Sequence, residues 1–226
     1  MDTLIFPPVI TSVPIFGTQT SFPVRRIFCV GRNYTEHARE MGNDERDPPF
    51  FFTKPSDAVV RSGVTLPYPK GTESLHHEAE LVVAIGESCS DVSVEQAEDA
   101  IFGYACGNDL TRRDIQAIAK AAKRPWDMSK GFDQSAVIGD IHLKTTPLRD
   151  ATITCHVDGV LKQTGNISDM IWSVAEVIST LSGLVDLRPG DLIMTGTPAG
   201  VGPVAPGETC EVQVGTLSPA KFTYVD

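Results

Sequence analysis

The sequence predicts an α+β fold that is predominantly β, a mixed β-roll or sandwich with a few short helices. Short apolar runs rich in β-branched and aromatic residues recur along the chain, whereas only two or three segments have helical periodicity. The expected strands lie at residues 26–30, 50–54, 81–85, 101–109, 151–157, 160–163 and 192–194. Because these strands do not alternate regularly with helices, a doubly wound sheet is not expected.

The composition indicates a single globular domain that binds neither nucleic acid nor membranes. The 226 residues are 41% hydrophobic and 21% charged, which is enough chain to bury a large core. A formal net charge of −10 leaves no basic block to neutralise phosphates. No apolar run approaches the roughly 20 residues that span a bilayer, and the N-terminus lacks the basic start of a signal peptide, so a cytoplasmic protein is expected. The five cysteines contain no Cys-x-x-Cys pair, which argues against a disulfide framework or a zinc site.

Residues 1–24 are rich in proline, and we expect an N-terminal extended segment that wraps a sheet or a neighbouring subunit. Residues 25–226 are expected to form the main domain. After the strand at 26–30, Asn33 followed by Glu36 has the spacing of a capping box and predicts a helix at 34–41. His37 and Glu40 lie on one face of that helix, where a carboxylate beside an imidazole suits general-base work on water. A solvated polar helix face is the alternative.

The next loop and strand offer two further candidates. Residues 42–49 are polar and end in proline, and the sequence leaves open whether this loop closes over a site. The strand at 50–54 ends in Lys54, which is either an edge-strand gatekeeper or a contact for an anionic substrate.

The stretch from His76 to Ile85 places two carboxylates at the start of a buried strand. Side chains alternate along a strand, so Glu78 and Glu80 point to the same face. Burying two like charges is costly, and a hard divalent cation with oxygen ligands is a natural compensation. The alternative is a strand whose first residues are hydrated at the solvent edge.

The strand at 101–109 ends in Asp109, which is either an oxygen ligand or part of the start of the following helix. Thr111 with Asp114 three residues later predicts that helix start, and an apolar stripe is expected at Ile115, Ile118, Ala119 and Ala122, with Pro125 ending the helix. Residues 126–133 are expected to be a loop carrying Lys130. That lysine is either a surface charge or, beside a carboxylate–metal site, a group that stabilises an enolate.

The last third supplies a hairpin, a helix and a glycine-rich loop. Asp158-Gly159 predicts a tight turn between the strands at 151–157 and 160–163, and residues 168–182 have the pattern of an amphipathic helix. The loop at 195–203 brings backbone N–H groups and the Thr197 hydroxyl close to a ligand. Because it lacks the lysine of a phosphate-binding loop, nucleotide binding is rejected.

Six motifs follow one another along the chain: CVGRNYTEHAREM, FFTKP, HHEAELVVAIG, GNDLTRRDIQ, SKGFD and GDLIMTGTPAGVGP. Together and in this order they resemble the fumarylacetoacetate hydrolase superfamily, in its short single-domain branch of acylpyruvate and fumarylpyruvate hydrolases. The resemblance implies a mixed β-sandwich roll, usually a homodimer, with Mg²⁺ or Mn²⁺ held by Glu78, Glu80 and Asp109. It also implies a His37/Glu40 dyad, the loop lysine at Lys130, and substrate contacts at Gln116 and Thr197. Arg32 and Lys54 are further substrate-binding candidates.

The resemblance further implies a metal-dependent hydrolase that cleaves the C–C bond of a 2,4-dioxo acid, with fumarylpyruvate giving fumarate and pyruvate as the first choice. Decarboxylation of oxaloacetate or isomerisation of a related 2-oxo diacid is the alternative, because both reactions use the same stabilised enolate. A catalytically silent binding protein is not favoured, since the ligands, the dyad and the lysine are all present. His77 stands where tyrosine is common in the fumarylpyruvate hydrolase-like members, and this departure bears on the exact substrate.

Overall fold

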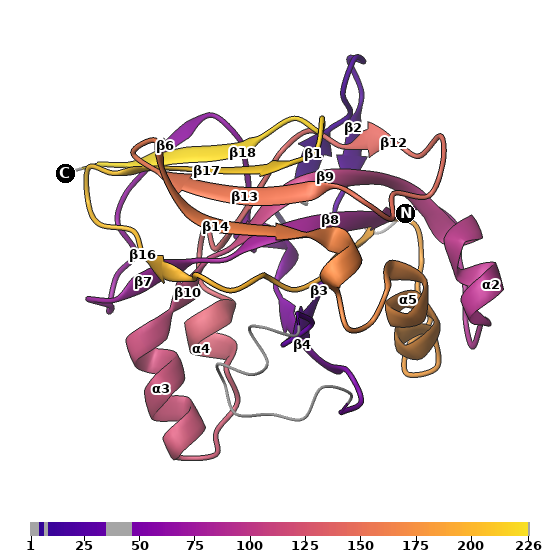
Figure 1. Ribbon diagram of the computed structural model, residues 1–226, viewed down its shortest axis with the longest axis horizontal. Helices are drawn as coiled ribbons and strands as arrows, with labels where there is room; N and C mark the ends of the chain where they lie inside the picture. Colours follow the sequence, from indigo (N-terminus) through magenta and orange to yellow (C-terminus); the bar gives the residue numbers. More distant parts are fainter. Residues whose placement is uncertain (1–4, 7–8, 35–46, 226) are drawn as a thin grey trace.

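The computed structural model describes residues 5–6, 9–34 and 47–225, and it confirms the expected fold class. The main sheet is mixed and has eight strands (Figure 1). In spatial order they are β4 (Phe50–Lys54), β3 (Arg26–Gly31), β15 (Asp191–Met194), β8 (Ala79–Ile85), β9 (Ile101–Asp109), β11 (Ala136–Ile138) and β5 (Val59–Arg61), with β12 (His142–Leu143) paired to β9. The β15–β3 and β11–β5 pairs are parallel, and the other pairs of this sheet are antiparallel.

A second sheet of five strands packs over the main sheet (Figure 1). Its order is β14 (Val160–Asn166), β13 (Thr152–Val157), β17 (Thr209–Val214), β18 (Ala220–Tyr224) and β6 (Val64–Leu66). The larger hydrophobic cluster lies between the two sheets and joins Leu81 and Val83 of β8 to Ile153 of β13 and Val212 of β17. The predicted hairpin forms through Asp158-Gly159, both with positive φ, as a tight turn requires.

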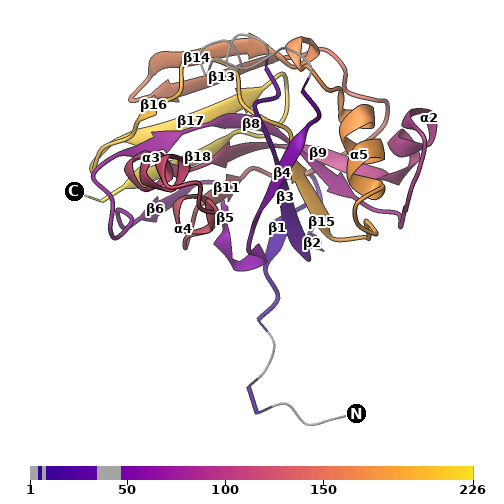
Figure 2. The same cartoon turned by 90° about the horizontal axis from the view of Figure 1, so that it is seen from below.

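A short hairpin, β1 (Ser12–Pro14) and β2 (Ser21–Pro23), covers the other face of the main sheet. Val13 and Phe22 pair across the hairpin and join the second hydrophobic cluster with Val82 and Leu192. Residues 5–6 and 9–10 lie away from the body of the molecule (Figure 2). This N-terminal arm, defined here as Ile5, Phe6, Val9 and Ile10, leaves its side chains 71–94% exposed.

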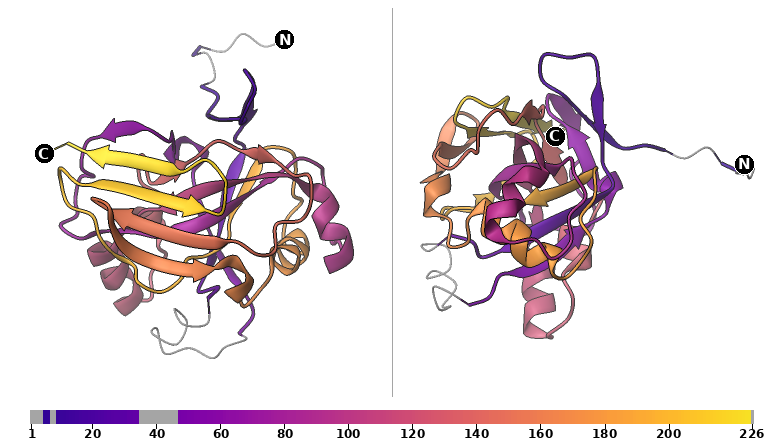
Figure 3. Two further views of the ribbon diagram at one scale, coloured as in Figure 1. Left: turned by 45° about the horizontal axis from the view of Figure 1, so that its top comes forward. Right: turned by 90° about the vertical axis from the view of Figure 1, so that its right-hand side faces the viewer.

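The helices gather at two ends of the sheets (Figure 1). Helix α2 (Val94–Ala97) lies beside α5 (Val174–Ser182) at one end, and α3 (Arg113–Ala121) lies beside α4 (Asp127–Lys130) at the other, as the views in Figure 3 also show. Single 3₁₀ turns are η1 (Ser56–Ala58), η2 (Glu98–Ala100) and η3 (Ile167–Asp169). A third small sheet, β10 (Thr111–Arg112), β7 (Leu75–His77) and β16 (Gly202–Pro203), lies above α3. None of the helices in the described ranges is long and apolar enough to cross a membrane.

The predicted start of α3 at Thr111 is wrong. Thr111 belongs to β10 and donates its hydroxyl to the Asp109 carbonyl at 3.0 Å, and the helix begins only at Arg113. Asp114 accepts the Thr72 hydroxyl at 2.7 Å instead of completing a capping box with Thr111. The two-residue pairing of β10 with β7 takes the place of a helical turn because it joins the strand end to the neighbouring sheet.

The predicted apolar stripe on α3 is also wrong in part. Ile118 is 66% exposed and Ala122 is exposed, whereas Gln116 and Ala119 are buried. The helix buries a polar side chain because that side faces the candidate site described below.

Two further boundaries differ from the predictions. The segment expected as a loop at 126–133 contains the single turn α4, closed by the Ser129 and Lys130 N–H groups on the Trp126 carbonyl. The helix expected at 168–182 begins only at Val174, after the η3 turn. Asn33 binds both the N–H and the carbonyl of Trp172, and this pairing holds residues 170–173 outside the helix.

Candidate active site

Strand pairing brings the three predicted carboxylates together at one end of β8 and β9. The two strands pair with Glu80 opposite Gly107, and the Asp109 N–H donates to the Glu78 carbonyl at 2.9 Å. One oxygen from each of Glu78, Glu80 and Asp109 lies within 4.8 Å of the others. The three side chains are 6%, 2% and 1% exposed, so the carboxylates are buried and are not at a hydrated strand edge.

Three cations surround two of the carboxylates. Lys130 Nζ donates to Glu78 Oε2 and to Asp109 Oδ2, both at 2.7 Å, and so bridges them. Arg113 Nη2 donates to Glu78 Oε1 at 2.6 Å. Lys54 Nζ lies 2.7 Å from Asp109 Oδ1. Each buried negative charge on Glu78 and Asp109 is therefore matched by lysine or arginine, as a stable buried charge requires.

Glu80 is held differently. Its Oε2 accepts the Gly196 N–H at 2.8 Å, and among the described residues no lysine or arginine pairs with it. Gly196 has φ +100°, and a Cβ there would lie 2.7 Å from the Cβ of Asn33. Only glycine gives the chain this close turn beside Glu80.

Burial and charge shift the acid–base properties of the cluster in opposite directions. Burial alone would raise the pKa of Glu78, but Lys130 and Arg113 hold that pKa well below its ordinary value. Burial, Asp109 and Glu78 together raise the pKa of Glu80 well above its ordinary value. Burial lowers the pKa of Lys130, yet Asp109 and Glu78 outweigh it and keep the ammonium group protonated.

The donor set fits a hard divalent cation. It offers three carboxylate oxygens close together in a buried position, the ligand type that Mg²⁺ and Mn²⁺ prefer. The carboxylate of Glu80, with a raised pKa and no ammonium beside it in the described part of the chain, is the group that a metal ion would stabilise most. The triad of Glu78, Glu80 and Asp109 can therefore hold a divalent metal ion.

Most of the predicted substrate-binding residues line the same cavity as the triad. The predicted Arg32, Gln116 and Thr197 do so, together with Lys130. Gln116 Oε1 accepts Arg113 Nη1 at 2.7 Å, which links α3 to Glu78. The remaining lining residues are Val30, Gly31, Phe50, Phe52, Arg113 and Trp126.

Other predicted residues lie elsewhere. Lys54 is 2% exposed and does not line the cavity. Its ammonium group pairs with Asp109 and donates to the carbonyls of Leu110 and Lys130, so Lys54 holds the Asp109 carboxylate in place. His37 and Glu40 lie outside the described residues, and their role stays a prediction.

Several residues of the site were not predicted from the sequence. Arg113 carries a simple signal, since it follows Arg112 at the start of the element after Asp109. Gln163, which donates a hydrogen bond to the Thr197 hydroxyl at 2.8 Å, has no such signal, because a glutamine in the return strand of a hairpin is typical of an ordinary surface residue. The aromatic wall of Phe50 and Trp126, with ring centres 5.4 Å apart, joins two segments far apart in the sequence.

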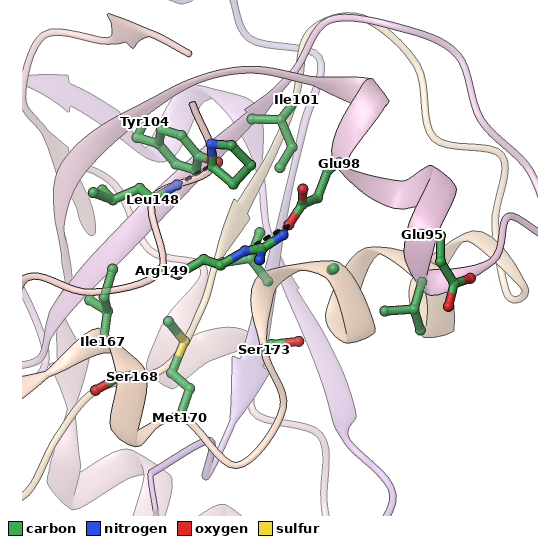
Figure 4. Close-up of a pocket in the computed structure, with 14 residues that line it drawn as sticks. Glu95, Glu98, Ile101, Tyr104, Leu148, Arg149, Ile167, Ser168, Met170 and Ser173 are labelled. Carbon is green, nitrogen blue, oxygen red and sulfur yellow. Dashed lines mark hydrogen bonds and ion pairs between the residues drawn. The ribbon is translucent and has the colours of Figure 1, made fainter. Parts of the chain in front are cut away.

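A larger cavity, of about 630 Å³, lies between α2, α5 and β9, at the end away from the triad (Figure 4). Figure 4 shows Arg149 paired with Glu98 across it, at 2.7 Å. Apolar side chains such as Ile101 and Met170 line much of the rest. Among the described residues, the cluster of three carboxylates lines the smaller cavity, and no such cluster lines this larger one.

Comparison with known proteins gives concordant matches. A family model described as "Fumarylacetoacetate (FAA) hydrolase C-terminal" matches residues 26–224. A crystal structure of fumarylpyruvate hydrolase from Pseudomonas aeruginosa in complex with Mn²⁺ and pyruvate is similar, with a TM-score of 0.96, 47% sequence identity and 99% of each chain covered.

Two curated relatives carry different activities in their names. A fumarylpyruvate hydrolase from Ralstonia sp is 44% identical over 160 residues, 70% of this chain and 83% of that protein. A mitochondrial oxaloacetate decarboxylase from Dictyostelium discoideum is 42% identical over 187 residues, 81% of this chain and 86% of that protein. The family model covers nearly the whole chain, and the relatives agree with it along most of its length. The chain belongs to the fumarylacetoacetate hydrolase family.

Proposed function

We propose that this protein is a metal-dependent hydrolase that cleaves the C–C bond of an acylpyruvate, with fumarylpyruvate as the substrate and fumarate and pyruvate as the products. The observation that carries the proposal is the buried triad with Lys130 bridging two of its members. The similar structure from P. aeruginosa has Mn²⁺ and pyruvate bound, and pyruvate is one of the two products proposed here.

The charges of the site suit a dianionic 2-oxo acid. Among the described residues, three cations face three carboxyl groups, one of which, Glu80, has a raised pKa, so the cluster carries no net negative charge before a metal ion is bound. A divalent ion at the triad supplies a Lewis acid for the oxygens of the 2-oxo acid end. The added positive charge is matched by a substrate that brings negative charge of its own.

Lys130 is placed to stabilise the charge that develops during cleavage. In the reaction, water adds to the distal ketone, the bond to the neighbouring CH₂ breaks, and its electron pair passes into a pyruvate enolate. The protonated ammonium group of Lys130, fixed by Glu78 and Asp109, lines the cavity and presents a preorganised positive charge to that enolate. Protonation of the CH₂ carbon then releases pyruvate.

The sequence assigns water activation to the dyad. His37, oriented by Glu40, would take the proton of the attacking water as a general base. The structure does not describe these two residues, so this role rests on the resemblance alone.

The acyl end of the substrate is proposed to lie against the aromatic wall. A fumaryl group is flat and ends in a carboxylate, which suits the rings of Phe50 and Trp126 and the guanidinium groups of Arg32 and Arg113 at the same cavity. Arg32 also lies over the Phe50 ring, with its Cζ 5.4 Å from the ring centre.

Decarboxylation of oxaloacetate or isomerisation of a related 2-oxo diacid is the second candidate. The similar decarboxylase from D. discoideum favours decarboxylation, which also passes through a pyruvate enolate. It needs no attacking water, so the change Glu40→Gln is expected to lower hydrolysis much more than decarboxylation. Equal loss of both activities would contradict the proposed dyad.

We also propose that the protein is a cytoplasmic homodimer. The dimer is supported by the N-terminal arm, whose four apolar side chains are 71–94% exposed and would be covered by a second copy.

The test of the proposed function is the ultraviolet loss of the enol absorbance of fumarylpyruvate, with and without EDTA, with both products quantified. Metal-dependent loss with fumarate and pyruvate in equal amounts is expected. No loss, together with metal-dependent release of pyruvate from oxaloacetate, would replace the hydrolase by the decarboxylase.

A further inference from the structure

Gln163 lies on the five-stranded sheet, and its side chain bonds residues next to the candidate site although it does not line the cavity. It lies on β14, is 1% exposed, and reaches both the start of β8 and the loop after β15. We propose that Gln163 is a positioning residue that fixes the Thr197 hydroxyl as a hydrogen-bond donor to the carboxylate end of the substrate. This inference rests on the proposed function, because it assumes an anionic ligand at the triad.

The orientation of the Gln163 amide is determined by its partners. Oε1 accepts the Ala79 N–H at 3.0 Å, and Nε2 donates to the Pro198 carbonyl at 2.8 Å. A backbone N–H can only donate and a carbonyl can only accept, so the amide cannot be flipped. This orientation also fixes the other two hydrogen bonds. Nε2 donates to Thr197 Oγ1 at 2.8 Å, and Oε1 accepts a hydrogen bond from the Nδ1–H of His77 at 2.8 Å.

The bond from Gln163 decides the direction of the Thr197 hydroxyl. Because Oγ1 accepts the Nε2 proton, its own proton must go to another acceptor. Among the residues that the structure describes, the hydroxyl has no second hydrogen-bond partner. Thr197 lines the cavity with Glu80 and Lys130, so the hydroxyl is left as a donor for an anionic ligand there.

The same contacts explain the unusual residue before the first carboxylate. His77 is fully buried and does not line the cavity. The Nδ1–H of His77 donates a hydrogen bond to Gln163 Oε1, whereas Thr197 is bonded to Gln163 Nε2. His77 therefore acts on the site through Gln163. The departure at His77 therefore concerns the support of Thr197 and not a direct substrate contact.

The test measures binding of oxalate, a dianionic mimic of a 2-oxo acid enolate, to the Mn²⁺-loaded protein by calorimetry. Thr197→Val removes the donor and keeps the shape of the side chain, and it is expected to weaken oxalate binding about 10- to 100-fold. Gln163→Met leaves the hydroxyl without its fixed direction and is expected to weaken binding in the same sense.

The double variant separates positioning from a structural role. If Gln163 acts through Thr197, the change Gln163→Met has no further effect on oxalate binding once Thr197→Val is present. An undiminished effect in that background would overturn the proposal, because it would mean that Gln163 acts through Ala79 or Pro198. Gln213→Met is the matched control, since Gln213 Nε2 also donates two hydrogen bonds, here to the carbonyls of Gly215 and Leu217, but Gln213 lies on β17, outside the cavity.

Gln163→Glu keeps the size of the side chain and the acceptor for Ala79, so it tests the proposal even where Gln163→Met does not fold. A carboxylate oxygen at this position accepts a hydrogen bond from the Thr197 hydroxyl. The hydroxyl proton then points to residue 163 and is no longer available to a ligand in the cavity. Oxalate binding weaker than in Thr197→Val is expected, with KM raised more than kcat is lowered and Mn²⁺ affinity unchanged. Oxalate binding equal to that of the wild type would contradict the proposal.

The binding assay does not depend on turnover. A protein that fails to cleave fumarylpyruvate but shows the predicted pattern with oxalate would overturn the proposed function and leave the role of Gln163 intact. Wild-type Mn²⁺-loaded protein that does not bind oxalate would overturn the donor role itself.

Discussion

Glu80 is the residue of the triad whose charge depends most on a metal ion. Glu78 and Asp109 are bonded to Lys130, whereas Glu80 is bonded to the Gly196 N–H and, in the described chain, to no cation. Burial and the two neighbouring carboxylates raise its pKa above the ordinary value of 4.5. Glu80 in the metal-free protein is therefore expected to keep its proton to a higher pH than an ordinary glutamate does, and metal binding is expected to favour the release of that proton.

The raised pKa of Glu80 makes the stability of the metal-free protein depend on pH. A carboxyl group with a raised pKa in the folded state stabilises the protein fully below its unfolded pKa of 4.5, and this contribution is lost as pH rises toward the folded pKa. Glu78 has the opposite shift, and its contribution is complete about one pH unit above the unfolded value. We expect the stability of the wild type relative to Glu80→Gln to fall as pH rises above the ordinary glutamate pKa of 4.5, by at most about 1.4 kcal/mol per pH unit.

Chemical denaturation of both proteins in EDTA, at several pH values, measures this difference. Comparing the two proteins removes the contributions of the histidines that they share. A difference that does not change with pH would contradict the raised pKa of Glu80.

Lys130 is expected to matter for both stability and turnover. Lys130→Met leaves two buried carboxylates without their bridging ammonium, which costs about 3–5 kcal/mol of the free energy of unfolding in the metal-free protein. The loss of a preorganised charge beside the enolate is expected to lower kcat about 100-fold or more in the metal-loaded protein. Lys120→Met is the control, because Lys120 lies on the exposed side of α3 and should change neither quantity strongly. A kcat for Lys130→Met close to that of the wild type would contradict the role of the ammonium group.

Residues on one strand could be predicted, and residues joined across elements could not. Alternation along a strand is enough to place Glu78 and Glu80 on one face, and the end of the next buried strand supplies Asp109. Arg113 and Gln163 reach the site only through the docking of α3 and of the second sheet, which no local pattern specifies. The contacts of Lys54 with Asp109 depend on the pairing of distant segments in the same way.

At the scale of elements, every strand that was predicted is present, whereas two helix starts were wrong. Other strands were not predicted, among them β17 and β18 of the second sheet. The predicted strands are runs of apolar and aromatic residues, which leave few alternatives. The side chains of a capping motif can also make other hydrogen bonds. The Thr111 hydroxyl bonds the Asp109 carbonyl, and Thr111 pairs with β7 as part of β10 instead of starting a helix. At residues 170–173, Asn33 binds the backbone that would otherwise continue a helix.

Helix α5 offers a test of how independent the elements are. The Ser173 hydroxyl caps this helix by accepting the Glu176 N–H, and the Glu176 carboxylate accepts the Ser173 N–H. Ser173→Ala is expected to lower the free energy of unfolding by about 1 kcal/mol. Because α5 lies at the end away from α3 and α4 (Figure 1), the affinity for Mn²⁺ should not change. Ser93→Ala at the shorter and more exposed α2 is the matched variant and should cost less. A weaker Mn²⁺ affinity in Ser173→Ala would contradict this independence.

At the scale of the whole molecule, two sheets pack against each other, and the site lies at one end of β8 and β9 in the main sheet. The N-terminal arm lies outside this body and exposes four apolar side chains. Removal of residues 1–10 is expected to leave the hairpin β1–β2 and the core intact but to weaken the proposed dimer. Light scattering after gel filtration measures the mass of both forms, and an unchanged dimer in the shortened protein would show that the arm does not form the interface.

The most direct test of the central claim compares fumarylpyruvate cleavage by the wild type and by Glu80→Gln, each saturated with Mn²⁺ as far as it binds, with Glu95→Gln on the exposed face of α2 as the control. We expect equal amounts of fumarate and pyruvate from the wild type and from Glu95→Gln. Glu80→Gln should bind Mn²⁺ much more weakly and form neither product above the metal-free rate. Full Mn²⁺ binding and full activity in Glu80→Gln would contradict the assignment of the triad as the catalytic centre.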